Sequence, residues 1–136
     1  MERTHRLIAI VDDDPLDRFI SKAVIDQHYK DSQLLFFSNG IEIMEYLEMH
    51  QQNPARLPDM IFLDIQMPVC DGWMFMNLLS SRDHLHLKKL PIYILSSSID
   101  GLQKMRLQYQ TVTGFIEKPL TLKKLENHYS PTNYVL

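Results

Sequence analysis

Acidic residues and one lysine stand at the ends of three apolar runs that lie far apart in this chain. The three segments are Val11-Asp12-Asp13-Asp14, Leu63-Asp64 and Ile116-Glu117-Lys118-Pro119. Apolar runs of this kind are typical of strands buried on both faces of a parallel sheet. Ligands bind at the carboxyl edge of such sheets, so we expect these charged side chains to share one cleft. A cleft of carboxylates with one ammonium indicates chemistry around a metal ion and a phosphoryl group.

Asp12, Asp13 and Asp64 would repel one another in such a cleft. Two carboxylates about 4 Å apart repel by roughly 4 kcal/mol at an effective dielectric constant of about 20. The repulsion is relieved if some of them are protonated or if a hard divalent cation binds among them. Mg²⁺ takes one or two carboxylates and keeps water ligands that phosphate oxygens can replace. We therefore predict a Mg²⁺ site here.

Asp64 is the predicted nucleophile, because it stands alone at the end of its strand and is followed by a turn. A carboxylate can accept a phosphoryl group and form an acyl phosphate. Phosphoryl transfer requires mainly positioning and neutralisation of the phosphoryl oxygens. Mg²⁺, the Lys118 ammonium and either the Ser96 hydroxyl or a backbone N–H would each neutralise one oxygen.

Length and composition limit the classes of protein that fit. The chain has 136 residues and a formal net charge of −3, which favours one domain and gives no electrostatic reason to expect nucleic acid or an anionic membrane as a partner. No apolar run is long enough to span a bilayer, and no signal peptide is evident. The single cysteine, Cys70, cannot form an internal disulfide. We expect a reduced, cytoplasmic protein.

Strand patterns alternate with helix patterns along the chain, which predicts βα units and a parallel sheet. The predicted strands are 7–11, 33–37, 60–63, 91–95 and 114–117, and the helical patterns follow at 15–24, 41–47, 73–79, 102–109 and 121–129. Five such units predict an α/β, doubly wound three-layer sandwich with a five-stranded parallel sheet in the flavodoxin-like order 2-1-3-4-5. We expect one domain over residues 1–136, with a core from about 5 to 129 and a flexible tail over 130–136.

Together these features resemble the response regulator receiver domain of two-component signalling. The matching motifs are Val11-Asp12-Asp13-Asp14, Asp64 with Met67-Pro68 and Asp71-Gly72, Ser96, and Lys118-Pro119, and they extend over nearly the whole chain. The resemblance implies that Asp64 is the phospho-acceptor and that Asp12 and Asp13 hold Mg²⁺. It adds the backbone carbonyl of Gln66 as a metal ligand, Ser96 as the switch hydroxyl and Phe115 as the coupled aromatic residue. It also implies that Lys118 pairs with the phosphate and that the Lys118–Pro119 bond is cis.

The resemblance also implies a function and partners. A sensor histidine kinase or a histidine phosphotransfer protein would phosphorylate Asp64, and the surface of the fourth helix, fifth strand and fifth helix would then change its affinity for a downstream protein. The protein would catalyse only its own phosphorylation and dephosphorylation. No output domain follows Lys118, so we expect a stand-alone receiver. The sequence leaves open phosphorylation-dependent homodimerisation, the identity of the kinase and the downstream target.

Two other functions fit the sequence less well. A Mg²⁺-dependent aspartyl-phosphate phosphatase needs a general acid two residues after its nucleophile, and Gln66 occupies that position. A receiver that binds partners without phosphate usually lacks the acceptor, the acid pair or the lysine, all of which are present here. Two departures from the family are mild: phenylalanine replaces the commoner tyrosine at 115, and serine replaces threonine at 96. For Asp14 we expect a helix N-cap.

Overall fold

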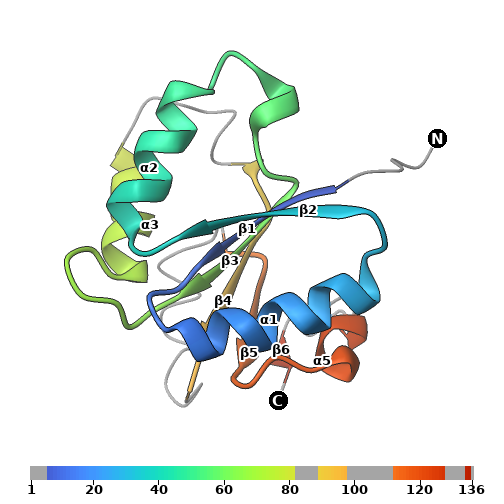
Figure 1. Ribbon diagram of the computed structural model, residues 1–136. Coiled ribbons are helices and arrows are strands. Elements are labelled where there is room, and N and C mark those ends of the chain that lie inside the picture. Colours follow the sequence, from blue (N-terminus) through green and yellow to red (C-terminus); the bar gives the residue numbers. More distant parts are fainter. Residues whose placement is uncertain (1–5, 82–88, 98–111, 128–133, 136) are drawn as a thin grey trace.

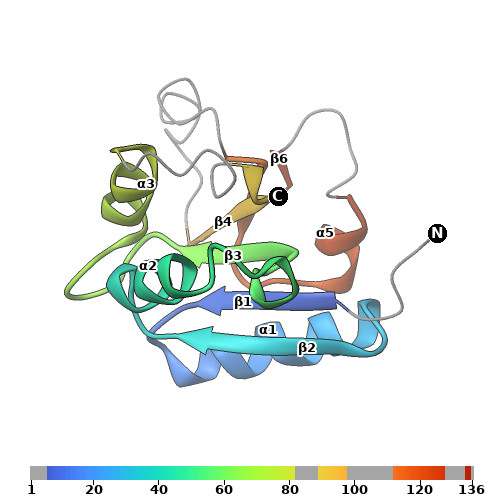
Figure 2. The same cartoon turned by 90° about the horizontal axis from the view of Figure 1, so that it is seen from above.

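A six-stranded, all-parallel sheet forms the centre of the molecule. The computed structural model describes residues 6–81, 89–97, 112–127 and 134–135. The strands are β1 (Arg6–Val11), β2 (Ser32–Phe37), β3 (Met60–Asp64), β4 (Ile92–Ser96), β5 (Gly114–Glu117) and β6 (Tyr134–Val135). Their order is β2-β1-β3-β4-β5-β6, and Figure 2 shows β1, β2 and β3 side by side. The predicted doubly wound fold with strand order 2-1-3-4-5 is therefore confirmed.

Helices cover both faces of the sheet, so the fold has three layers (Figure 1). One face carries α1 (Pro15–His28) and α5 (Leu122–Glu126), and the other carries α2 (Gly40–Met49) and α3 (Gly72–Ser81). A short 3₁₀ helix, η1 (Pro54–Arg56), precedes β3. The helical pattern predicted at 102–109 lies outside the described residues. Within the part of the chain that the structure describes, no helix is long and apolar enough to cross a bilayer.

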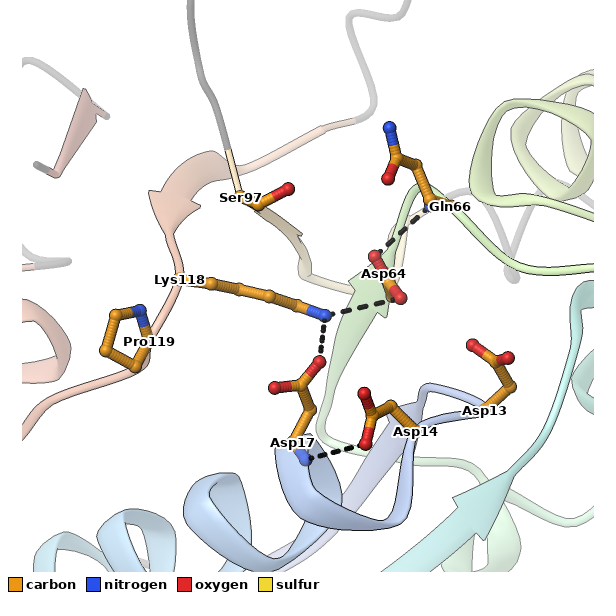
Figure 3. Close-up of a pocket in the computed structure, with 8 residues that line it drawn as sticks. All are labelled: Asp13, Asp14, Asp17, Asp64, Gln66, Ser97, Lys118 and Pro119. Atoms are coloured by element: carbon orange, nitrogen blue, oxygen red, sulfur yellow. Dashed lines mark hydrogen bonds and ion pairs between the residues drawn. The ribbon is translucent and has the colours of Figure 1, made fainter.

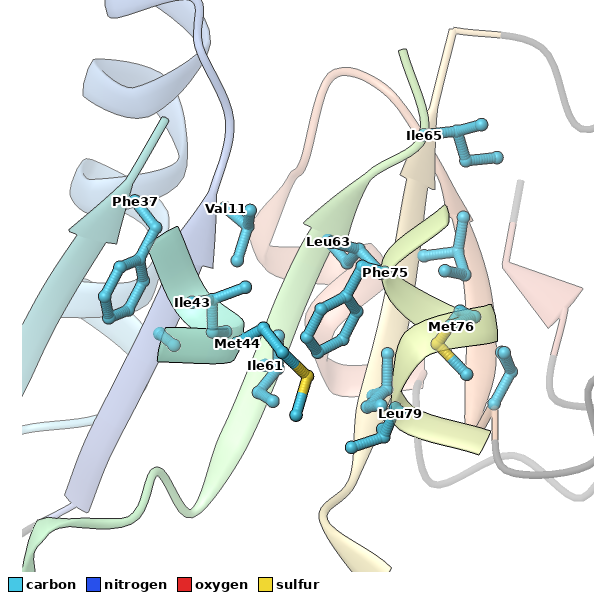
Figure 4. Packing of buried hydrophobic residues seen from close by; sticks show 14 of the residues in the cluster. Val11, Phe37, Ile43, Met44, Ile61, Leu63, Ile65, Phe75, Met76 and Leu79 are labelled. Carbon is cyan, nitrogen blue, oxygen red and sulfur yellow. The ribbon is translucent and has the colours of Figure 1, made fainter. Parts of the chain in front are cut away.

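Alternation along β1 divides the apolar core into two clusters. Ile8 and Ile10 pack with α1 and α5, whereas Ala9 and Val11 pack with α2 and α3. This follows from the period of two that strand side chains have. Figure 4 shows the α2–α3 side, where side chains of both helices lie over β1 and β3. The same alternation decides on which side of the sheet each charged residue at the strand ends emerges.

Of the tail expected to be flexible over 130–136, the structure describes only residues 134–135. They form β6, which pairs in parallel with β5 in the register Phe115↔Tyr134 and Ile116↔Val135. The physical reason is that β5 would otherwise be an edge strand with unpaired backbone N–H and C=O groups. An extended segment that reaches this edge can satisfy them, and hydrophobic periodicity carries no information on such pairing.

The apolar stripe predicted along the helix after Pro15 is only partly buried. Ile25 is fully buried and Val24 packs against the core, but Leu16 and Phe19 are 64% and 70% exposed. The first turn of α1 lies at the carboxyl edge of the sheet, directly after β1, where it has little sheet surface to cover. Spacing of apolar residues therefore predicted the helix correctly but not the face that is buried.

Candidate functional site

Strand register places Asp12 and Asp64 on the same side of the sheet. Ile10 and Phe62 are register partners in β1 and β3, and both belong to the cluster beneath α1 and α5. Asp12 and Asp64 follow these residues by two positions, so their side chains point to the α1 side as well. Both carboxylates are almost completely buried. Two negative charges are therefore enclosed at adjacent strand ends.

The loop between β1 and α1 is held by its own polar groups. Asp14 is the N-cap of α1, as predicted: its Oδ1 accepts hydrogen bonds from the backbone N–H groups of Leu16 at 2.8 Å and Asp17 at 3.5 Å. Asp12 Oδ1 accepts from the Asp14 N–H at 3.0 Å. The Arg18 guanidinium donates to the Asp12 carbonyl, which supports the peptide that carries the acid pair.

Lys118 joins the ends of β1, β3 and α1 through its ammonium group. Its Nζ lies 2.8 Å from Asp17 Oδ2, 3.0 Å from Asp12 Oδ2 and 3.3 Å from Asp64 Oδ2. Its backbone N–H donates to the Ser96 carbonyl at 2.7 Å, and the bond to Pro119 is cis, as the resemblance implied. The lysine is thus tied to β4 by its backbone and to three carboxylates by its side chain.

A polar cavity of about 410 Å³ opens at this edge of the sheet (Figure 3). It is lined by Asp13, Asp14, Asp17, Asp64, Gln66, Ser97, Lys118 and Pro119. In Figure 3 the Asp64 carboxylate faces the Lys118 ammonium, with Asp13 on one side and Gln66 on the other. The Gln66 N–H donates to Asp64 Oδ1 at 3.2 Å. The other carboxylate oxygen, Oδ2, faces Lys118.

Asp12, Asp13 and Asp64 fit a hard divalent cation. Each offers a carboxylate oxygen, and these oxygens all lie within 4.8 Å of one another. Asp13 is exposed and the other two are buried. A cation can therefore reach the group from solvent and still contact two buried carboxylates. Oxygen ligands of this kind suit Mg²⁺ and similar ions. The Gln66 carbonyl as a further ligand remains a prediction.

The pKa values of Asp64 and Lys118 are both raised, which disfavours the charged form of the carboxyl group and favours the charged form of the ammonium group. Burial raises the pKa of the Asp64 carboxyl to about 6, with a further upward contribution from the Asp12 charge, while Lys118 and the Gln66 N–H lower it. Burial lowers the pKa of Lys118, but the hydrogen bonds that its ammonium donates to Asp17 and Asp12, together with the charges of Asp12 and Asp64, outweigh burial and raise that pKa above its ordinary value. Asp64 therefore carries a destabilised negative charge, which is a favourable starting point for a nucleophile.

Neither Ser96 nor Phe115 lines the cavity. Ser96 is buried at the end of β4, and the following residue, Ser97, lines the cavity instead. Phe115 is fully buried in the cluster beneath α2 and α3. Their switch roles stay predictions. Ser97 was missed because the triplet of serines at 96–98 carries no signal for which side chain turns inward.

Asp17 was also missed as a residue of the site. Its position in the first turn of α1 indicates a favourable interaction with the helix dipole, and that is all the sequence indicates. The contact with Lys118 joins residues 101 positions apart. Helical spacing cannot reveal a partner on another strand, although an acid three residues after the N-cap does point toward the same edge as the cap.

The loop between β3 and α3 brings backbone close to the nucleophile. Gly72 begins α3, and its N–H donates to the Ile65 carbonyl at 3.0 Å. A Cβ atom at position 72 would lie 2.7 Å from the Asp64 carbonyl oxygen. Cys70, in the same loop, is fully buried, and burial followed by the Asp71 charge raises the pKa of its thiol. The lack of a side chain at Gly72 is thus needed for the close approach of α3 to β3.

Comparison with known proteins identifies the family that has this fold. The family model for the response regulator receiver domain matches residues 8–130. The chain therefore belongs to the response regulator receiver domain family of two-component signalling.

Individual relatives show the same similarity. The chain is 30% identical over 113 residues to the sensor histidine kinase CheAY of Helicobacter pylori, covering 83% of this chain but only 13% of that protein. A two-component response regulator from Cytophaga hutchinsonii has a similar structure, with a TM-score of 0.80 and 25% identity over 94% of this chain and 96% of that one. The phosphorylated cyanobacterial phytochrome response regulator RcpA gives a TM-score of 0.71, also at 25% identity, with the same coverage.

Proposed function

We propose that Asp64 is the phospho-acceptor of this receiver and takes its phosphoryl group from a phosphohistidine on a sensor kinase or a phosphotransfer protein. The observation that carries the proposal is the enclosure of Asp64 between the Lys118 ammonium and the carboxylates of Asp12 and Asp13, at the wall of an open cavity. The phosphorylated state of RcpA supports it by similarity.

The residues of the cavity have different roles in the phosphoryl transfer. An Asp64 carboxylate oxygen attacks phosphorus, the P–N bond to the donor histidine breaks, and its electron pair returns to the imidazole nitrogen. Lys118 compensates the negative charge of one phosphoryl oxygen, and backbone N–H groups at the strand ends supply further donors. Asp12, Asp13 and Asp64 would hold Mg²⁺, which when bound neutralises charge on the carboxylates and the phosphoryl group. No separate substrate is turned over, so the protein acts as a switch.

The switch would operate through Ser96 and Phe115. A phosphoryl group on Asp64 would attract the Ser96 hydroxyl, at the end of β4, as well as the Lys118 ammonium, directly after β5. A shift of Ser96 leaves space that the neighbouring Phe115 ring can occupy. The surface around β5 and α5 then changes its affinity for a downstream protein, because the phosphoryl group favours one of two conformations.

The first turn of α1 offers a surface for the phosphoryl donor. Leu16 and Phe19 are exposed apolar side chains on the helix that also carries Asp17 into the cavity. A donor protein that brings a phosphohistidine to Asp64 must approach this edge of the sheet, and exposed apolar side chains there favour protein association. A histidine kinase or phosphotransfer partner is also consistent with the likeness to the kinase CheAY. Location in the cytoplasm and homodimerisation stay predictions.

Intact-mass spectrometry after incubation with acetyl phosphate and MgCl₂ tests the acceptor. Wild-type protein should gain the mass of one phosphoryl group, and chelation of the metal with EDTA should prevent the gain. Asp64→Asn should gain nothing, because its amide cannot form the acyl phosphate. Asp14→Asn serves as the matched control, since asparagine also caps helices and Asp14 contributes its carboxylate to the cap.

Two outcomes would contradict the proposal. Phosphorylation that persists unchanged in Asp64→Asn would place the acceptor elsewhere. A wild-type protein that stays unmodified by acetyl phosphate and by phosphorylated donor proteins would leave the phosphate-independent binding module as the better account.

A further inference from the structure

The Lys118 ammonium donates hydrogen bonds to Asp12 and Asp17 and forms an ion pair with Asp64. An ammonium carries three donors, and three carboxylates surround this one, from Asp12, Asp17 and Asp64. The shortest of the three contacts, 2.8 Å, is the one to Asp17. A phosphoryl oxygen that is to receive an N–H from Lys118 must therefore displace one of these carboxylates or share a donor with it.

Asp17 is held in this position by the start of α1. Its backbone N–H is within the cap made by Asp14, and its side chain points across the cavity to the end of β5 (Figure 3). A favourable interaction with the helix dipole would explain an acid in this turn that points into solvent. Here the side chain is only 31% exposed and its carboxylate contacts the ammonium of another element. The dipole alone does not account for that direction.

The three carboxylates differ in what happens to them during phosphorylation. Asp64 becomes the acyl phosphate, and Asp12 belongs to the group of three acids whose oxygens lie within 4.8 Å of one another. Asp17 does not belong to that group, although it lines the same cavity. It is thus the carboxylate that stays available to Lys118 after the other two have taken new partners.

We propose that Asp17 is a positioning residue that holds the Lys118 ammonium at the α1 side of the cavity and competes with the phosphoryl group for it. The inference deepens the proposed function and rests on it. Asp17 thereby weakens the contact between Lys118 and the phosphoryl oxygens and shortens the time for which the phosphorylated conformation persists.

Calorimetric titration with beryllofluoride, an analogue of the phosphoryl group, tests the inference at saturating MgCl₂. Asp17→Asn removes the competing charge, so it should bind beryllofluoride roughly threefold to tenfold more tightly than wild type, as expected for loss of one partly exposed ionic hydrogen bond. The lifetime of the phosphorylated protein, followed by intact mass, should lengthen by a similar factor. Thermal melts check that the variants are folded.

Two matched variants separate competition from a general effect of charge. Asp17→Glu keeps the carboxylate and should stay within about twofold of wild type. Asp14→Asn removes one negative charge from the same cavity but leaves the Lys118 contacts in place, so competition predicts a clearly smaller gain in beryllofluoride affinity for it than for Asp17→Asn. A change in Asp14→Asn as large as that in Asp17→Asn would overturn the inference, because charge alone would then explain both.

The wild-type titration distinguishes failure of this inference from failure of the proposed function. If wild type binds beryllofluoride and Asp17→Asn binds it no more tightly, the role of Asp17 is wrong and the proposed function stands. If wild type binds none in the presence of MgCl₂, the proposed function fails and the inference fails with it.

Discussion

The two helical layers use their side chains in different ways. α2 and α3 have 10 residues each, and each buries four of them, including Leu47 and Phe75. α1 is longer, with 14 residues, but only Ser21 and Ile25 are buried, while Leu16 and Phe19 face solvent. Burial of apolar surface is the main favourable term in folding. The α2–α3 layer therefore contributes more stability per residue than α1.

Although α1 buries few side chains, it contributes several polar residues to the site. Its cap residue and its first turn line the cavity, through Asp14 and Asp17, and its Arg18 supports the peptide of the acid pair. The sheet beneath it ends in Asp12 and Asp64 on the same side. The comparison indicates that the α2–α3 side of the sheet mainly stabilises the fold, whereas the α1 side carries the charged residues at the carboxyl ends of the strands. The stability of the fold and the chemistry of the site can therefore be perturbed separately.

The largest expected effect comes from truncating the same residue type in the two layers. Phe75→Ala removes a fully buried ring from α3 and should lower the free energy of unfolding by about 3–5 kcal/mol. Phe19→Ala removes an exposed ring from α1 and should change it by less than about 0.5 kcal/mol. Urea denaturation followed by circular dichroism measures both. Equal losses would show that the two layers do not differ as described.

Asp64→Asn should raise the free energy of unfolding rather than lower it, because the variant removes a buried and destabilised negative charge. The pKa of Asp64 is raised from 3.8 to about 6, so the folded protein binds more protons than the unfolded chain between these values. Stability of the wild type therefore falls as pH rises through that window. Asparagine does not ionise, so the variant should be more stable at pH 7 in metal-free buffer, by up to about 3 kcal/mol.

Denaturation as a function of pH measures this difference. It should vanish below about pH 4, where the carboxyl group is protonated in both states. An advantage of Asp64→Asn that is the same at pH 4 and pH 7 would contradict ionisation as the cause.

A further variant tests the close approach of α3 to the nucleophile. In Gly72→Ala the new Cβ would lie 2.7 Å from the Asp64 carbonyl oxygen and 3.0 Å from the Ile65 Cα, both backbone atoms that cannot turn aside. We expect the free energy of unfolding to fall by about 1–3 kcal/mol. Met74→Ala, at an exposed position of the same helix, is the control and should change it little. A Gly72→Ala protein as stable as wild type would show that α3 shifts freely.

Phe19→Ala, which should have the smallest effect on stability, should affect partner binding. Phe19→Ala should slow phosphorylation by a donor protein, because the ring is part of the exposed apolar surface beside the cavity. Its phosphorylation by acetyl phosphate, which needs no docking surface, should stay unchanged. Comparing the two rates by intact-mass spectrometry measures the docking contribution. Equal slowing with both donors would mean that Phe19 acts on the site rather than on the partner.

Much of the fold could be predicted from local pattern. Five apolar runs marked the strands of the sheet from β1 to β5, because strands covered on both faces need continuous apolar sequence. Asp14 and Pro15 marked the start of α1 correctly, since capping depends on neighbouring residues alone. The position of acids after the first and third of these runs indicated a shared edge. The strand order that makes them adjacent came from the fold class.

Tertiary structure decided the rest, because the remaining features depend on partners distant in the chain. The sequence by itself determined which residues are acidic, which runs are strands and where the first helix begins. Only the folded chain decided that Asp17 meets Lys118 across 101 residues, that Ser97 rather than Ser96 lines the cavity, and that residues 134–135 pair with β5. Local patterns record burial and capping, whereas the direction of a side chain at a strand end or a first helical turn depends on what packs beside it.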